Sequence, residues 1–246
     1  MRKIKPVIFD VVTLFPRMFE GPMTESIIRK AQKEGLIEVR VHNLRQWSID
    51  SRHSKVDDRP FGGGAGMVIQ AEPIYRAIKD LGGLKKKNKP WVVYLSPQGT
   101  RFSQDLGEKI AKKQHVLFIC GHYEGIDERV MEFIDQEISI GDYILTGGEL
   151  PVMVVIDAVS RFLPGVVGDP ESVKNDSFAN GLLDTAHYTR PGIWRGKAVP
   201  PVLLSGDHKK IAQWREKRAF EQTKKKRPDL LKNKILKKNN NSKISN

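Results

Sequence analysis

The stretch HVLFICGHYEG, residues 115–125, decides the fold. After His115 it runs through five apolar residues, a length typical of a strand buried on both faces of a parallel sheet. Glycine and polar residues follow at once, so the strand should end in a loop. The same succession recurs in WVVYLSPQG (91–99) and EISIGDYILTGG (137–148). We therefore predict three strands, at 91–95, 115–120 and 137–140, each followed by a loop.

The remainder of the first 162 residues alternates between strand and helix patterns. Ser103 and Asp127 should cap helices, while the glycine-rich segment 50–66 has the composition of a long loop. Strands that alternate with helices of this size predict an α/β fold, with a parallel sheet and helices on both faces. The further elements predicted are strands at 6–14 and 36–41, helices at 25–33, 72–81, 103–113 and 150–162, and a short helix at 127–134.

The loops at 96–99, 121–125 and 141–148 should meet in one crevice, because ligands bind outside the carboxyl ends of strands in an open parallel sheet. Their glycines let the backbone approach a ligand closely. The sequence contains no GxGxxG, GxxxxGK[ST], HExxH, GxSxG or cysteine pair. This disfavours an ordinary dinucleotide fold, a P-loop, a serine hydrolase and a zinc site. The ligand expected is one that backbone groups can hold, such as an adenine ring with its ribose.

Charge is concentrated at the C-terminal end of the 246-residue chain. Of the net charge of +13, residues 205–246 carry +10, with 14 Lys or Arg against 4 Asp or Glu. Such a segment predicts binding to a polyanion. Trp214 and Phe220 lie among these charges, which favours RNA contact over 208–227, although aromatics also pack in cores. For the Lys/Asn-rich end, 232–246, a solubilising tail is an equal alternative.

Composition also indicates the cell compartment and the domain organisation. No apolar run approaches the roughly 20 residues of a membrane span. The single cysteine, Cys120, suits a reducing cytosol, so we expect a cytoplasmic protein that does not enter membranes. A Gly-, Pro- and acid-rich stretch at 164–176 predicts a linker. It would join a cofactor-binding domain, 1–163, to a small, mainly helical RNA-binding domain with a basic tail, 177–246.

Seven stretches strongly resemble the bacterial tRNA (guanine-N1)-methyltransferases, of the SPOUT class of knotted methyltransferases. The resemblance runs in order over residues 6–222. It implies a deep trefoil knot in the C-terminal part of the α/β domain and a homodimer whose active site lies at the subunit interface. It also implies methyl transfer from S-adenosyl-L-methionine to N1 of the guanosine 3′ of the anticodon, tRNA position 37. The stretches are DDRPFGGGAGM (57–67), YLSPQG (94–99), CGHYEGIDER (120–129), SIGDYILTGGELP (139–151), SRFLPGVVG (160–168), DSFANGLLD (176–184) and HYTRP (187–191).

The resemblance also assigns roles to residues. Asp176 would be the general base that removes the N1 proton, and Arg161 would neutralise the charge that develops at O6. Without the resemblance, Asp176 would be an N-cap or turn residue and Arg161 a solvated charge on a helix flank. The resemblance also places Asp184, His187 and Arg190 on the RNA-binding face, although any of them could be structural. The basic segment 208–227 adds Lys209 and Arg215 as expected RNA contacts. The cofactor pocket would comprise Leu95, Ser96, Pro97, Gly99, Gly121, Tyr123, Glu124, Gly125, Ile140, Gly141, Asp142, Tyr143, Ile144, Leu145, Gly147, Gly148 and Pro151.

Some features leave alternatives open. Glu124 would orient the charged end of the cofactor or a metal ion. No dedicated metal site is predicted, and Mg²⁺ would be weakly held between RNA and cofactor. His122 stands where the family more often has Arg, and Ala65 where it usually has Pro. The competing functions are a knotted methyltransferase of another RNA site, such as a ribose hydroxyl, and a non-catalytic RNA-binding module.

Overall fold

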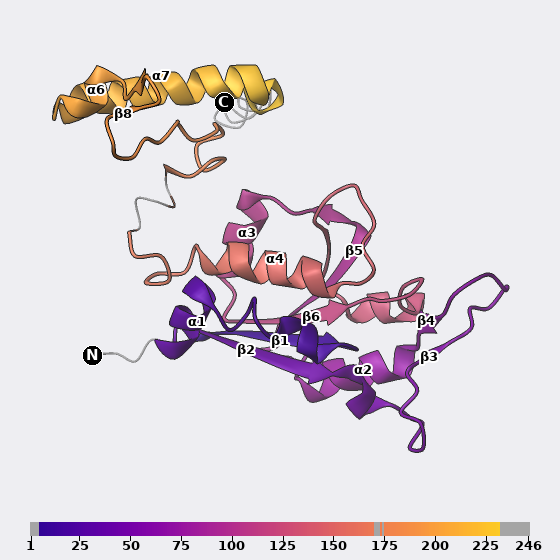
Figure 1. The fold of residues 1–246 in the computed structure, drawn as a ribbon. Coiled ribbons are helices and arrows are strands. Elements are labelled where there is room, and N and C mark those ends of the chain that lie inside the picture. The colour runs from indigo at the N-terminus through magenta and orange to yellow at the C-terminus, as the bar shows by residue number, and fades with distance from the viewer. Residues whose placement is uncertain (1–4, 170–172, 174, 232–246) are drawn as a thin grey trace, which may run out of the picture. The chain divides into compact units, whose positions relative to one another are not determined.

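The computed structural model describes residues 5–169, 173 and 175–231, and the chain divides into two compact units, 1–168 and 169–246 (Figure 1). The first unit contains a five-stranded sheet in the order β2-β1-β6-β5-β7, with every strand pair parallel. The predicted α/β fold with a parallel sheet is therefore confirmed. Its strands are β1 (Val7–Thr13), β2 (Ile37–Asn43), β5 (Trp91–Arg101), β6 (His115–Cys120) and β7 (Gln136–Ser139).

The helices of the first unit lie close to their predicted positions. Ser103 caps α3 by accepting the N–H of Leu106 at 3.3 Å, and Asp127 caps η3 by accepting that of Arg129 at 3.0 Å. The segment predicted as a short α-helix at 127–134 is the 3₁₀ helix η3. The helices are η1 (Pro16–Phe19), α1 (Ser26–Lys33), η2 (Leu44–Trp47), α2 (Ala71–Asp80), α3 (Gln104–Ala111), η3 (Glu128–Phe133) and α4 (Glu149–Ser160).

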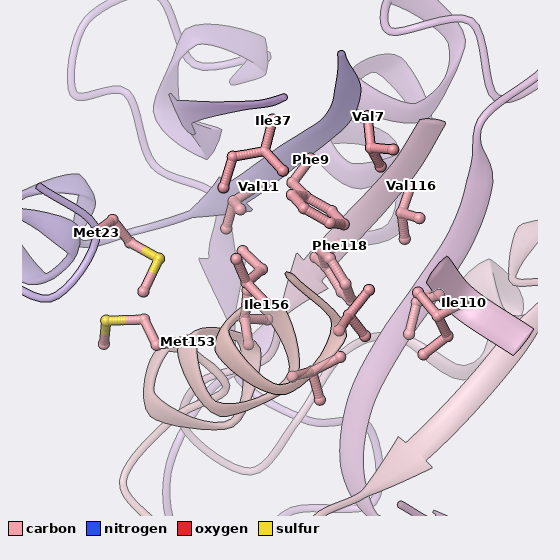
Figure 2. Close-up of a cluster of buried hydrophobic side chains, with 14 of the residues drawn as sticks. Val7, Phe9, Val11, Met23, Ile37, Ile110, Val116, Phe118, Met153 and Ile156 are labelled. Carbon is pink, nitrogen blue, oxygen red and sulfur yellow. The ribbon is translucent and has the colours of Figure 1, made fainter. Parts of the chain in front are cut away.

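Helices cover both faces of the sheet, as predicted. Side chains alternate along each central strand, so each strand contributes apolar residues to both faces. On β6, Phe118 joins a core formed with α1, α3 and α4, which Figure 2 shows around Phe9 and Ile156. The next residue, Ile119, belongs to a second core formed with α2, η2 and η3. Burial on both faces explains the uninterrupted apolar run that predicted this strand.

The predicted end of β5 at Leu95 was wrong. Leu95 and Thr100 both pair with Ile138 of β7, so the strand resumes after an excursion of residues 96–99 and continues to Arg101. At Gly99 a Cβ would meet the backbone of Glu137 and Ile138, so only glycine allows this close approach. The predicted loop 50–66 is also interrupted: β3 (Asp57–Asp58) pairs with β4 (Val68–Ile69) in a short antiparallel hairpin.

The described part of the second unit includes a small hairpin, β8 (Ile193–Trp194) and β9 (Lys197–Ala198), followed by the helices α6 (Pro201–Leu204) and α7 (His208–Lys226). Thr223 of α7 is fully buried; its hydroxyl accepts the N–H of Leu183 at 2.8 Å and donates to Ala219 at 2.7 Å. This contact ties α7 to the segment before the hairpin. The stretch predicted as a tail, 232–246, lies outside the described residues. Within the part of the chain that is described, no helix has the length and apolarity to cross a membrane.

Candidate functional site

A cavity of about 400 Å³ lies at the excursion 96–99 of β5 and at the loops that follow β6 and β7. These strands are neighbours in the sheet, so the three segments meet. The predicted convergence of the three segments is confirmed, although 96–99 lies within β5 and not after it. Every residue expected in the cofactor pocket lines this cavity except Gly99 and Asp142. Gly99 instead contacts the backbone of β7, and Asp142 lies 3.9 Å from Arg101. The remaining lining residues were not predicted as site residues: Tyr94, Gln98, His122, Ile138, Ser139 and Thr146.

The loops are held together by backbone contacts that require glycine. Gly148 donates its N–H to the carbonyl of Gly121 at 2.7 Å, and residues 122 and 147 form a β-bridge. A Cβ at Gly148 would lie 2.9 Å from the Gly121 nitrogen, and one at Gly121 would lie 2.9 Å from the Tyr94 hydroxyl. At Gly141, where φ is +150°, a Cβ would lie 2.6 Å from the Tyr143 ring. Part of the glycine requirement is therefore internal to the protein, independent of any ligand.

Apolar side chains are exposed around the cavity. Tyr143, Ile144 and Leu145 follow one another in the loop before α4 and are 54%, 79% and 38% exposed. Tyr123, from the loop after β6, is 45% exposed and has a positive φ of 60°. Exposed apolar groups beside a concave site are typical of ligand-binding surfaces. With these exposed rings and apolar groups and the Glu124 carboxylate, the lining of the cavity suits a small molecule that has both a flat ring and a charged end.

A buried carboxylate lies behind the cavity. Glu149, at 1% exposure, accepts a hydrogen bond from the Thr13 hydroxyl at 2.7 Å. Its other oxygen lies 3.9 Å from Nδ1 of His122, a buried atom without a hydrogen-bond partner among the described residues. Glu149 is in the first turn of α4, where the helix dipole stabilises an anion. The pair Thr13–Glu149 thus ties the end of β1 to the start of α4, beneath two of the site loops.

Two further groups have shifted pKa values. Burial, together with the Glu137 and Glu128 carboxylates, raises the pKa of Tyr94 to about 12. The Tyr94 hydroxyl therefore stays protonated at neutral pH in the cavity wall. Burial and then the Glu149 charge raise the pKa of the Cys120 thiol well above its usual range. Because the thiolate is the nucleophilic form, Cys120 is unsuited to covalent catalysis.

The two residues predicted to be catalytic belong to different units. Arg161 is the C-cap residue of α4 in the first unit. Asp176, in the second unit, borders a hollow of about 930 Å³ with Asp184, His187 and Arg215. Three of the predicted RNA-contact residues are thus placed beside Asp176. His187 contacts Asp184 at 2.7 Å.

Arg190 and Lys209 do not border this hollow. Arg190 lines a neighbouring one of about 950 Å³, together with His187 and Arg215. Lys209 is exposed in the first turn of α7. These placements show which predicted RNA contacts share a surface, and their binding role stays a prediction.

A larger hollow of the first unit, about 1000 Å³, lies elsewhere, between the β3–β4 hairpin and η3. Asp58 and Arg59 line it together with Arg129, and the ring of Phe61 is fully exposed. Its lining mixes charges of both signs without the convergent backbone groups of the smaller cavity, so we assign the site to the smaller one. Among the described residues no group of three His, Cys, Asp or Glu is arranged to hold a metal ion.

A family model described as tRNA (Guanine-1)-methyltransferase TrmD matches residues 7–233. Curated relatives from three organisms carry the name tRNA (guanine-N(1)-)-methyltransferase. The protein of Endomicrobium trichonymphae is 54% identical over 231 residues, which cover 91% of this chain and 98% of the relative. Those of Dictyoglomus turgidum and Moorella thermoacetica are 52% and 53% identical, and both matches cover 90% of this chain and 89% of the relative.

Proposed function

The chain belongs to the tRNA (guanine-1)-methyltransferase family, and from this premise we propose how it works. It is an enzyme that methylates N1 of guanine in tRNA. We propose that the methyl donor is S-adenosyl-L-methionine and that the target is the guanosine on the 3′ side of the anticodon, position 37. Such an enzyme would work in the cytoplasm, where tRNA is found.

One observation carries the assignment of the donor site: the excursion 96–99 of β5 and the glycine-containing loops after β6 and β7 meet in one cavity. Backbone groups of 121–125 and 141–148 would hold the adenine and ribose. Tyr143, Ile144 and Leu145 would cover the ring, and Glu124 would face the amino group at the donor's charged end. When bound, the sulfonium supplies an electrophilic methyl group with its own leaving group.

The protein's own residues supply the other half of the chemistry. Guanine N1 carries a proton and is a poor nucleophile until that proton is removed. In the proposal the Asp176 carboxylate takes the N1 proton as the bond from N1 to the methyl carbon forms. The guanidinium of Arg161 donates hydrogen bonds to O6, where negative charge develops.

The two residues proposed to be catalytic belong to different units. Arg161 belongs to the first unit and Asp176 to the second, so neither unit contains the pair alone. We propose a homodimer in which one subunit supplies Arg161 and the other Asp176. The chain path supports a knot: β5 separates β7 from β6 in the sheet, yet the loop after β7 returns to hydrogen-bond Gly121 after β6.

The test uses an unmodified tRNA transcript and a donor with a labelled methyl group, followed by digestion to nucleosides. The label should appear in 1-methylguanosine and disappear when position 37 is changed from G to A. Asp176→Asn should lower single-turnover methylation by roughly 10²–10⁴-fold, the usual contribution of a general base, with unchanged donor binding. Asp229→Asn, an exposed change in the same unit, should be neutral.

Label on a ribose hydroxyl would contradict the proposed target. Near-normal turnover by Asp176→Asn would contradict the assignment of the base, and Asp184, in the same hollow, would be the next candidate.

A further inference from the structure

The β8–β9 hairpin of the second unit, located by the label β8 in Figure 1, carries large apolar side chains that are exposed. Trp194 pairs with Lys197 across a two-residue turn, Arg195–Gly196, and the carbonyl of Gly192 accepts the N–H of Val199 at the base. Ile193 and Trp194 are 68% and 58% exposed. A hairpin this short has no core of its own to bury them in.

The turn residues are not those that local stability favours. Arg195 and Gly196 have φ values of 48° and 75°, the left-handed conformation of a type I′ turn. Asn, Asp or Gly normally takes the first of these positions, because a larger side chain is strained there. Instead the guanidinium carbon of Arg195 lies 5.1 Å from the centre of the Trp194 ring. The turn therefore holds a cation against an exposed indole at a conformational cost.

The hairpin is continuous with a cationic surface. Gly192 and Val199, which close its base, line the same hollow as Tyr188, Arg190 and Arg215. Among the described residues that line this hollow none is acidic. An exposed aromatic beside several cations complements a nucleic acid, whose bases stack on aromatic rings while its phosphates pair with Lys and Arg.

We propose that the hairpin is a stacking platform for an unpaired base of the RNA substrate. The base stacks on Trp194, while Arg195 and Lys197 contact its flanking phosphates. Because every base has a π-face, the platform recognises a single-stranded segment rather than a particular base. The inference rests on the proposed function, since it assumes that the second unit meets tRNA, and it adds a binding element outside the methyl-transfer site.

The experiment measures tRNA affinity and tryptophan fluorescence. Trp194→Ala should weaken binding roughly 5- to 100-fold, the range for loss of one stacked base, whereas Trp194→Phe should retain most of the affinity. Titration with tRNA should quench indole emission in the wild type, and Trp194→Phe should lose that part of the quenching. Arg195→Asn should weaken binding and reduce the salt slope by about 1 without lowering the melting temperature, because Asn suits the turn. Phe61→Ala, which removes a fully exposed aromatic of the first unit, should bind tRNA normally.

If Trp194→Ala binds tRNA with unchanged affinity across a salt titration, the proposed stacking role is wrong and the methyltransferase assignment is unaffected. A lower melting temperature or altered oligomer mass in Trp194→Phe, with normal RNA binding, would show that the indole packs against protein instead. Failure of the wild type to label guanosine would count against the proposed function. The two Trp194 variants and Arg195→Asn use separate readouts, so a folding defect in one of them does not remove the test.

Discussion

Asp10 joins three strands of the sheet through one buried carboxylate. It lies on β1 at 2% exposure, with one oxygen 2.7 Å from His42 on β2 and the other 2.5 Å from His115 on β6. Burial by itself raises the pKa of Asp10, but hydrogen bonds and charge from the two histidines outweigh it and lower the pKa to about 2. The folded state therefore favours the ionised form.

The depressed pKa predicts how stability depends on pH. Ionised Asp10 stabilises the fold above its unfolded pKa of about 3.9, and this contribution is lost as pH falls towards 2. Asp10→Asn should therefore cost about 2 kcal/mol near neutrality, and the gap to the wild type should narrow between pH 4 and 2. Urea denaturation over this range checks it, with the exposed Asp157→Asn as the control. A difference in free energy of unfolding between the wild type and Asp10→Asn that does not change with pH would exclude this role.

At the scale of the elements, the loop between β7 and α4 contains both closely packed glycines and exposed apolar side chains. Its glycines at 147 and 148 are needed for close approach to β6 and its loop, where a Cβ at Gly147 would lie 2.5 Å from His122. Its apolar residues 143–145 instead remain exposed. Glycine substitutions would disturb the protein itself, so the binding role of the loop is better tested at an exposed side chain.

Ile144→Ser should lower the affinity for S-adenosyl-L-methionine about tenfold, because it removes apolar surface that the ligand would cover. The change should leave the melting temperature nearly unchanged, since Ile144 is 79% exposed. Calorimetry measures the affinity, with Ile27→Ser on α1 as the matched control. Equal affinities for the two variants would remove this loop from the donor site.

At the scale of the whole molecule, the proposal divides the catalytic pair between two units and two subunits. Arg161→Ala and Asp176→Asn should each be inactive alone. Mixed dimers should recover about one quarter of the wild-type sites, because half of the dimers are mixed and each would carry one intact site. The measurement is single-turnover methylation after co-expression, with light scattering to establish the dimer.

The matched control is a mixture of Arg161→Ala with the double variant Arg161→Ala/Asp176→Asn. No subunit of this mixture has Arg161, so no intact site can form. Absence of recovery in the first mixture, with mixed dimers demonstrated, would place the complete site within a single chain.

Several elements could be predicted because their signals are local. The apolar run at 115–120 was long enough for one strand, and Ser103 and Asp127 carried cap chemistry in their own side chains. The hairpin at 193–198 was missed. Its turn has Arg–Gly rather than the Asn–Gly or Asp–Gly that signals a type I′ turn, and only four residues pair.

The candidate site was predicted in outline for the same reason. The three loops follow three apolar strands, and parallel strands present their ends together. Tyr94 and His122 lie within the motifs that define those loops, yet nothing in their local pattern shows that they line the cavity. Gly99 has the same loop-like surroundings but contacts β7 instead.

The sequence by itself determined the α/β class, the three segments that meet at the site and the family, because hydrophobic period and motif order can be read along the chain. Only the tertiary structure decided that Leu95 and Thr100 share one partner, that Thr13 meets Glu149 across 136 positions, and that Asp10 bridges two histidines. These contacts depend on strand order and register. Both are set by the joint burial of distant segments, which no local pattern encodes.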